Sequence, residues 1–472
     1  MSESVEDLMA KGVEHALNLG AFSAEAKGED TIQRSLEVIN GVVRTVSESR
    51  NLGIGIRVFH KKGNGFSFTN VLDMENIRQT AETAFKIARG SSKKSLFKLN
   101  LKEIQPTVEK KATNVKEHPR DVALDEKKDF CLRECKASSE YNKQIANTTA
   151  RFAEYYGSVY FLNSDGTKVS YEPLLVGLAV SCIAKKGSTI VDARDVYGGS
   201  YGLEVYKQEE HTPEKLGENA AKWAVEKLKA KPAPAGKFPA LINPELVGVL
   251  AHESFGHMSE ADGVVMGWSP LAKRIGEKLG TDNITIIDEG SPKEGGYRIF
   301  FDDEGVPCKR VEILKNGVLT NYLQSRMTAQ RLKMEPTGNA RSQDYSYDPI
   351  VRMRNTYFEK GDWKKEEALR ELKQGIYAID TSGGQADATG TFLFKAIRGY
   401  WIENGEIKYP LLDVALTGNI LEFLKNVDAV CDDLTISTSP FGGCGKRDQR
   451  AYVGDGGPHL RVKEVLFGGT GK

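Results

Sequence analysis

The stretch KPAPAGK, residues 231–237, is the plainest break in the chain. Proline lacks a backbone N–H and restricts the residue before it to extended conformations, so Pro232, Pro234 and Gly236 interrupt regular structure. The chain has 472 residues, whereas a single hydrophobic core stops growing near about 250–300 residues. We therefore predict that a new domain starts near Lys237.

Upstream of this break, helical and strand-like segments alternate twice. Apolar residues at helical spacing over about 4–19 and 75–89 enclose β-branched runs from Glu25 to Asn70, with turn residues at Asn40-Gly41 and at Gly63-Asn64-Gly65. After a Ser/Lys-rich stretch at 91–120, predicted to be a linker, the same order returns: a helix near 121–142, strands over 145–196 and a helix over 213–229. This pattern predicts two N-terminal α/β sandwich units, residues 1–110 and 111–236.

Downstream of the break, strand signals dominate. Hairpin dipeptides occur at Asn316-Gly317 and Asn404-Gly405, a helix is expected near 364–374, and glycines are frequent. We predict a large, mainly antiparallel β domain over 237–472, which makes the whole chain an α+β protein. Arg352 and Arg354 alternate with Met353 and are expected on a solvated strand face.

Composition excludes several classes of protein. The 65 Lys and Arg residues balance 65 Asp and Glu residues, which argues against a dedicated nucleic-acid binder. The segment 1–11 is no secretory signal, and the apolar stretch 173–184 is too short to span a membrane and is predicted to be a buried strand. We expect a cytoplasmic protein whose six cysteines are thiols. Because no glycine-rich nucleotide loop occurs, nucleotide chemistry has little support.

The chemistry-bearing segment is NPELVGVLAHESFGHMSEADG, residues 243–263. Asn243 and Pro244 predict a helix start, which places His252 and Glu253 on a helix. Their motif, His-Glu-x-x-x-His, puts the second imidazole, His257, five residues after the first, about 140° around a regular helix. Convergence on one metal ion therefore requires a π-bulge or an unwound helix, and Gly256 lowers the cost of either.

Two neutral imidazoles are suited to zinc, and an adjacent carboxylate can take a proton from the attacking water. A catalytic zinc needs a third protein ligand, for which composition alone cannot choose among Glu260, Cys308, Cys431, Cys444 and His459. Cys444 has the most informative surroundings, because the glycines of PFGGCGK let the backbone approach another element closely.

The chain resembles the TldD side of the TldD/PmbA family over nearly its whole length, from GIGIRVF at 53–59 to the terminal FGGT. The resemblance is carried by AHESFGHMSEAD (251–262), FDDEGVP (301–307), PTGNARSQ (336–343), RMRNTY (352–357), GIYAIDTSGGQAD (375–387) and FGGCGK (441–446). Relatives commonly have Glu-Gly-Asp where this chain has Glu260-Ala261-Asp262.

The resemblance implies a zinc metalloprotease with one Zn²⁺ per chain, held by His252, His257 and Cys444, with Glu253 as the general base. It further implies a PmbA-like, non-catalytic partner subunit, with a homodimer as the alternative. An extended or unfolded peptide is the expected substrate, and no nucleic-acid or membrane partner is expected. The substrate-binding residues are unknown at this stage.

Two other functions stay open. The first is a non-enzymatic regulator, related to gyrase or to a toxin–antitoxin system, in which zinc is structural. The second is a thiol-transfer protein that uses Cys444, although the chain contains no Cys-x-x-Cys motif.

Overall fold

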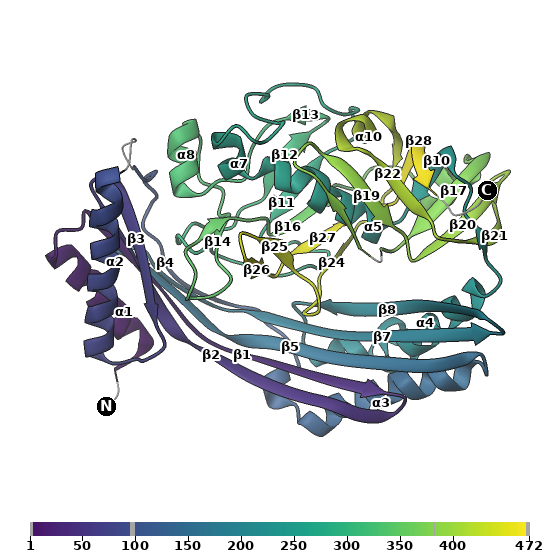
Figure 1. Ribbon diagram of the computed structural model, residues 1–472, viewed down its shortest axis with the longest axis horizontal. Helices are drawn as coiled ribbons and strands as arrows, with labels where there is room; N and C mark the ends of the chain where they lie inside the picture. The colour runs from purple at the N-terminus through teal and green to yellow at the C-terminus, as the bar shows by residue number, and fades with distance from the viewer. Residues whose placement is uncertain (1–2, 95–99, 382, 469–472) are drawn as a thin grey trace.

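The computed structural model describes residues 3–94, 100–381 and 383–468. It is an α+β protein in which one long, curved, mainly antiparallel sheet carries a β-rich C-terminal half on its concave side (Figure 1). The predicted fold class is therefore correct. The last residues of the FGGT motif, 469–470, lie outside the described residues.

The curved sheet is built on three unusually long strands. These are β1 (Ser23–Ile39), β2 (Val42–His60) and β5 (Ile145–Asn163). Fifteen consecutive residue pairs join β1 to β5, from Glu25 with Asn163 to Ile39 with Thr149. The two predicted N-terminal units therefore share one sheet, whose strand order is β3-β2-β1-β5-β6-β4. In addition, β7 pairs with β5, and β8 pairs with β7. The remaining strands are β3 (Gly63–Thr69), β4 (Val108–Ala112), β6 (Lys168–Glu172), β7 (Leu174–Lys186) and β8 (Thr189–Gly199).

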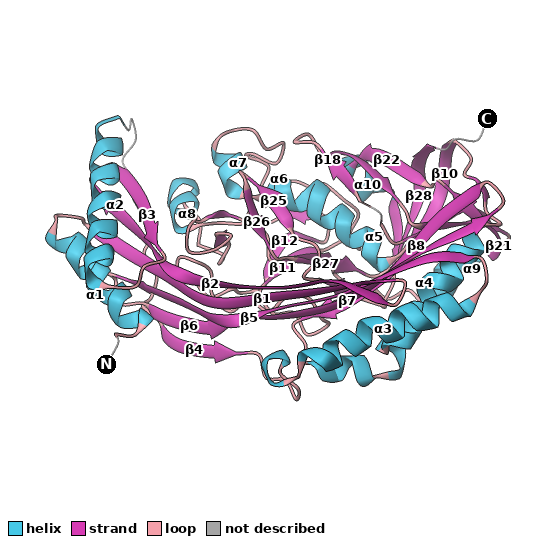
Figure 2. Cartoon of the chain, turned by 60° about the horizontal axis from the view of Figure 1, so that its bottom comes forward, coloured by secondary structure: helices cyan, strands magenta, loops and turns pink. Residues whose placement is uncertain are grey.

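Helix pairs cover the two ends of this sheet (Figure 2). Helices α1 (Val5–Asn18) and α2 (Met74–Lys94) bury apolar residues against β1 and β2. Helices α3 (Leu124–Tyr141) and α4 (Pro213–Lys227) pack on β5, β7 and β8. Short 3₁₀ helices occur at Pro119–Asp121, Leu203–Lys207 and Glu209–His211.

The sequence predictions for this half need three corrections. Helix α2 continues past Gly90 to Lys94, because an open helical glycine is tolerated at modest cost. The second hairpin turns at Lys61-Lys62, with Lys61 at φ 51°, and Gly63 and Gly65 lie in β3, where close backbone atoms of α2 leave no room for a side chain. The predicted linker contains β4, which pairs in parallel with β6. By contrast, the apolar stretch 173–184 forms most of β7 as predicted; it is buried at its start, whereas Ser181 and Ile183 near its end are exposed.

The C-terminal half contains two larger sheets. The ten-stranded sheet has the order β18-β19-β22-β28-β10-β17-β20-β21-β9, with β23 beside β28, and the six-stranded sheet has the order β13-β12-β11-β16-β27-β24. Both predicted hairpins, at Asn316-Gly317 and Asn404-Gly405, are present. The strands are β9 (Lys231–Pro232), β10 (Gly236–Ile242), β11 (Ile286–Glu289), β12 (Val311–Lys315), β13 (Val318–Leu319), β14 (Ala340–Arg341), β15 (Ile350–Val351), β16 (Asn355–Phe358), β17 (Gln374–Ile379), β18 (Gly384–Ala386), β19 (Thr391–Lys395), β20 (Arg398–Glu403), β21 (Glu406–Leu412), β22 (Ala415–Asn419), β23 (Val427–Val430), β24 (Thr435–Ser437), β25 (Cys444–Lys446), β26 (Gln449–Ala451), β27 (Gly454–Gly457) and β28 (Leu460–Gly468).

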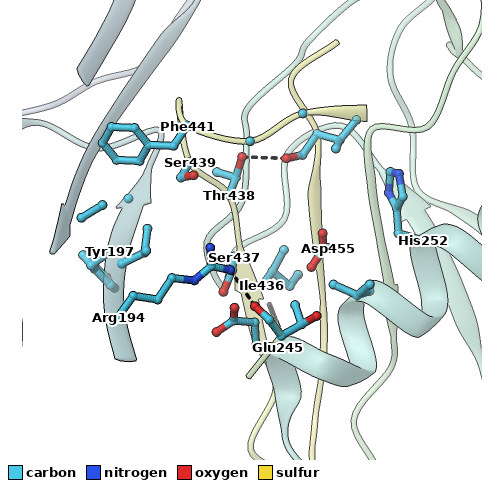
Figure 3. Close-up of a pocket in the computed structure, with 18 of the residues that line it drawn as sticks. Arg194, Tyr197, Glu245, His252, Ile436, Ser437, Thr438, Ser439, Phe441 and Asp455 are labelled. Carbon is cyan, nitrogen blue, oxygen red and sulfur yellow. Dashed lines mark hydrogen bonds between the residues drawn. The ribbon is translucent and has the colours of Figure 1, made fainter. Parts of the chain in front are cut away.

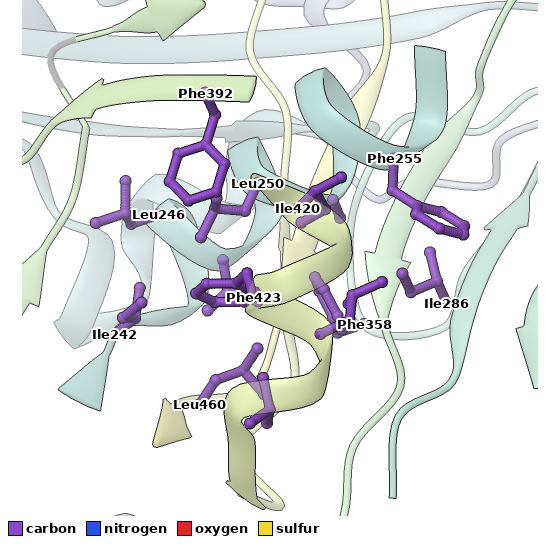
Figure 4. Close-up of a cluster of buried hydrophobic side chains, with 14 of the residues drawn as sticks. Ile242, Leu246, Leu250, Phe255, Ile286, Phe358, Phe392, Ile420, Phe423 and Leu460 are labelled. Atoms are coloured by element: carbon purple, nitrogen blue, oxygen red, sulfur yellow. The ribbon is translucent and has the colours of Figure 1, made fainter. Parts of the chain in front are cut away.

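A broken helix runs through the core between these sheets (Figure 4). It consists of α5 (Pro244–Val249), a π-helical turn (Leu250–Gly256), α6 (His257–Ser259) and α7 (Ala261–Val265). The side chains of Leu246, Leu250 and Phe255 in this helix are fully buried. The other helices of this half are α8 (Arg326–Leu332), α9 (Lys365–Arg370) and α10 (Ile420–Asn426). None of the described helices has the length and apolar character needed to cross a membrane.

Arg352 and Arg354 are fully buried, so the predicted solvated face is wrong. Arg354 donates from Nε to Oδ1 of Asp288 at 2.6 Å, and Arg352 donates to the backbone oxygens of Cys444 and Gln449. These hydrogen bonds offset part of the free energy that the two guanidinium groups lose when they leave water. The partners lie 66 to 97 residues away in sequence, which no local pattern reveals.

Candidate metal centre

The π-helical turn brings His252 and His257 to one side of the helix. Asn243 caps the start of α5, where its Oδ1 accepts from the backbone N–H of Leu246 at 3.2 Å, and the helix then widens over 250–256. The prediction that five-residue spacing requires such a distortion is confirmed. The two imidazole rings are 5.2 Å apart and nearly perpendicular. Gly256 leaves room for Met353, because a Cβ at this position would lie 2.1 Å from Sδ of that buried side chain, which would have to move.

Cys444 joins the two histidines from a different part of the chain. It begins β25, which pairs with β26 in a tight hairpin. Its Sγ lies 3.3 Å from Nε2 of His257. In the described part of the chain, His252, His257 and Cys444 form a group whose possible ligand atoms all lie within 4.8 Å of one another.

Charges at this cluster favour a thiolate. Burial disfavours the charged thiol, but hydrogen bonding with His252 and His257 outweighs it and lowers the pKa of Cys444 to about 5. Burial likewise opposes a charged His257 ring, yet Glu260 and Cys444 raise the pKa of His257 to about 11. Two imidazoles and a thiolate are a donor set that suits zinc, so the residues present fit this ion.

Glu253 lies at the wall of a cavity next to the cluster. Its side chain is about one-third exposed, and its Oε2 lies 3.9 Å from Nε2 of His257. The cavity has a volume of about 650 Å³ and lies between the long sheet and the C-terminal half. Figure 3 shows it with His252 at one side and Arg194 of β8 reaching in from the other. A molecule in this cavity can therefore reach His252, Cys444 and Glu253 together.

The sequence predictions missed two carboxyl groups that line the same cavity. Burial raises the pKa of Asp455 to about 6, and burial together with Asp380 raises the pKa of Glu245 to about 8. Their sequence surroundings, a glycine-rich strand and a helix start, give no signal of a site.

The other candidate third ligands lie outside the cluster. Glu260 accepts a hydrogen bond from His257 Nδ1 at 3.0 Å, so it contacts a proposed ligand and is not one of the three. His459 is engaged by Asp433 and Tyr377, at 2.6 and 2.8 Å. Cys308 contacts the backbone oxygen of Gly338, and Cys431 belongs to a separate apolar cluster.

Fold and site together define an α+β protein with a candidate metal centre beside an interdomain cavity. Residues 24–88, 117–228 and 235–469 match, in order, domain 1, the central domain and the C-terminal domain of the PmbA/TldA metallopeptidases. The chain belongs to this metalloprotease family.

Curated relatives agree with this assignment. A metalloprotease of Methanocaldococcus jannaschii is 35% identical over 95% of this chain and 98% of its own length. A metalloprotease of Methanothermobacter thermautotrophicus is 36% identical, covering 92% and 93% of the two chains. A protein of Saccharolobus solfataricus named zinc metalloprotease TldD homolog is 28% identical, covering 98% and 100%.

Solved structures share the fold. TldE from Thermococcus kodakarensis superposes with a TM-score of 0.76 at 19% identity, covering 98% of this chain and 99% of its own. A Thermotoga maritima protein described as a candidate modulator of a DNA gyrase gives a TM-score of 0.81 at 22% identity, covering 98% and 100%. At these identities the likeness concerns the fold.

Proposed function

We propose that this chain is a zinc-dependent peptidase that hydrolyses peptide bonds of unfolded or extended peptides, with one Zn²⁺ held by His252, His257 and Cys444. The observation that carries the proposal is the convergence of these three side chains next to a cavity whose wall includes His252, Glu253 and Cys444. Three protein ligands and an accessible cavity are typical of catalytic zinc, whereas structural zinc is closed by four ligands.

The reaction divides between the ion and the protein. A bound zinc supplies Lewis-acid polarisation of the scissile carbonyl and of the attacking water. Glu253 accepts a proton from that water and returns it to the nitrogen of the departing amine. Glu260 holds the Nδ1–H of His257, which leaves Nε2 of that ring free to act as a ligand.

An extended substrate is supported by the strands around the cavity. Within the described sheet, β8 pairs with β7 along one edge, and its residues Arg194, Val196 and Tyr197 line the cavity. A peptide added at such an edge gains affinity from main-chain hydrogen bonds, most of which are already used within the secondary structure of a folded protein. We therefore propose selectivity for unfolded chains.

The wider setting is also a proposal. We propose three domains, 1–110, 111–236 and 237–472; the family matches cover 24–88, 117–228 and 235–469. We propose assembly with a PmbA-like partner, with a homodimer as the alternative, and a cytoplasmic location, where reducing conditions keep Cys444 a thiol. Neither a nucleic-acid nor a membrane partner is proposed.

The test measures zinc content and the hydrolysis of an unstructured peptide, with and without the PmbA-like chain. Glu253→Ala keeps one zinc per chain and loses about 10²–10⁴-fold in activity, the usual contribution of a general base. His252→Ala loses the metal, and Glu464→Ala, at an exposed ion pair with Lys237, is the matched control.

Three results would count against the proposal. Unchanged activity in Glu253→Ala would remove this carboxylate from the mechanism. Zinc without hydrolysis in any assembly would favour the regulator with a structural ion. Equal cleavage of a folded domain and its denatured form would contradict the selectivity for unfolded chains.

A further inference from the structure

Lys446 links the two segments that carry the proposed zinc ligands. It lies in β25, two residues after Cys444. Its Nζ donates to Oε2 of Glu260 at 3.0 Å, to Oδ1 of Asp262 at 2.8 Å and to the backbone oxygen of Val351 at 2.8 Å. An ammonium group has three protons, so this lysine has a full set of partners. Its side chain is 18% exposed, unlike a solvated surface lysine.

The contact with Glu260 leads directly to a proposed ligand. The same Oε2 atom that accepts from Lys446 also accepts from Nδ1 of His257, at 3.0 Å. A carboxylate can only accept, so the imidazole proton is on Nδ1. Nε2 of the same ring lies 3.3 Å from Sγ of Cys444 and is the atom that would bind zinc. Lys446, Glu260 and His257 are therefore joined by a continuous chain of hydrogen bonds, which ends at a proposed zinc ligand.

The glycines beside Cys444 give its hairpin little conformational restraint of its own, so contacts with other segments help to fix its position. Gly443 and Gly445 flank the cysteine, and Gly443 has φ 155°, a conformation that side chains rarely allow. Arg352 holds the backbone oxygens of Cys444 and Gln449, which fixes the hairpin to the strand before β16. Lys446 instead fixes it to the segment after His257, across a separation of 184 to 186 residues.

We propose that Lys446 is a positioning residue of the metal centre: through Glu260 it orients His257 and holds the Cys444 hairpin at zinc-binding distance from the two histidines. The inference rests on the proposed function. Partners of this kind usually change metal affinity or activity by about 10–100-fold.

The direction in which zinc affinity changes when Lys446 is replaced distinguishes a positioning role from a purely electrostatic one. Lys446 is a cation near the proposed cation site, so simple electrostatics predicts that its removal tightens the binding of zinc. Positioning predicts that zinc binds more weakly. The same measurement therefore decides between the two explanations.

The experiment uses the full chain and compares Lys446→Met, which keeps the length of the side chain but removes its charge and donors, with the wild type. Lys425→Met is the matched control, since Lys425 forms an exposed pair with Glu422 elsewhere in the same half. We expect zinc, measured by competition with a chelating dye, to bind about 10–100-fold more weakly to Lys446→Met and unchanged to the control. The cobalt-substituted protein should show altered thiolate-to-metal absorption.

Further variants test whether Lys446 acts on the metal centre through Glu260 or only stabilises the fold. Lys446→Arg should recover part of the affinity, because it keeps the charge but not the compact ammonium geometry. Glu260→Gln should weaken zinc binding, and the double variant Glu260→Gln/Lys446→Met should lose little more than either single change if Lys446 acts through Glu260. Fully additive losses would contradict this coupling.

Wild-type zinc affinity and an unchanged cobalt spectrum in Lys446→Met would overturn the inference, and so would tighter binding. Failure of the proposed function looks different. If Glu253→Ala keeps its activity while Lys446→Met binds zinc weakly, the proposed reaction is wrong and the positioning role stands. If the wild type binds no zinc, both are wrong.

Discussion

Arg354 shows how strongly burial changes the contribution of a single charged residue to stability. Both its side chain and that of Asp288 are fully buried. Besides the contact from its Nε, Arg354 makes two more hydrogen bonds to Asp288. Its backbone N–H donates to Oδ2 of Asp288 at 2.8 Å, and its Nη2 donates to the backbone oxygen of Asp288 at 3.0 Å. The pair therefore joins β11 to the start of β16, beside the core that carries the broken helix.

We predict that Arg354→Met lowers the free energy of unfolding by about 3 kcal/mol, because it leaves the carboxylate of Asp288 buried without its counter-ion. Urea denaturation measures the loss. Arg310→Met is the control: Arg310 is 43% exposed and pairs with Glu359, so the loss there stays below about 1 kcal/mol. Equal losses in the two variants would show that burial does not decide the effect.

At the scale of an element, helix α3 contains a buried acid without a charged partner. Glu134 is fully buried, and neither carboxyl oxygen has a hydrogen-bond partner among the described residues. Burial, with smaller contributions from Cys135 and Asp195, raises the pKa of Glu134 well above its ordinary value of 4.5. The folded protein therefore keeps this side chain neutral inside the layer between α3 and α4.

The consequence is a pH-dependent stability with a definite sign. The folded state retains a proton that the unfolded state loses above its own pKa, so stability falls as pH rises from about 4.5, by up to about 1.4 kcal/mol per pH unit. Glu134→Gln removes this term. Its free energy of unfolding relative to wild type should rise by more than about 1 kcal/mol between pH 5 and pH 8.

Glu140→Gln, on the exposed side of the same helix, provides the comparison. Denaturant titrations at both pH values measure the two differences. A difference between Glu134→Gln and wild type that does not change with pH would mean that Glu134 titrates normally in the folded protein.

The broken helix shows what sequence can predict about an element. The spacing of His252 and His257 is incompatible with a regular helix if both bind one ion, and Gly256 makes a distortion inexpensive, so the π-helical turn follows from local information. The roles of Glu260 and Lys446 do not. Their contact spans 186 residues and depends on where the β25 hairpin is placed by the tertiary fold. Arg352 and Arg354 were mispredicted for the same reason, since an arginine's burial depends on a distant partner.

For the whole molecule, charged residues bind the long sheet to the C-terminal half. Arg57 of β2 is 4% exposed and pairs with Glu25 of the neighbouring strand. It also donates to Glu304, which lies 247 residues away, at 2.8 Å. Lys27 of β1 similarly reaches Asp303 at 2.9 Å.

These contacts predict that the two halves unfold together. In Arg57→Met, Glu25 and Glu304 remain buried without their shared cation, a loss of about 3–5 kcal/mol concentrated at the boundary between the halves. Far-UV circular dichroism and tryptophan fluorescence should give one coincident transition for wild type and two separated transitions for the variant. Both proteins carry Trp223→Phe, which removes the tryptophan of α4 on the long sheet, so that Trp268, Trp363 and Trp401 report on the C-terminal half while the sheet contributes to the dichroism.

Arg50→Met distinguishes this coupling from a general effect of losing an arginine from β2. Arg50 lies on the same strand, but it is 59% exposed and pairs with Asp30 of β1, within the long sheet. Its loss should leave a single transition, shifted by less than about 1 kcal/mol. Coincident transitions in Arg57→Met would contradict the prediction, because they would mean that the contacts of Arg57 are not needed to couple the unfolding of the two halves.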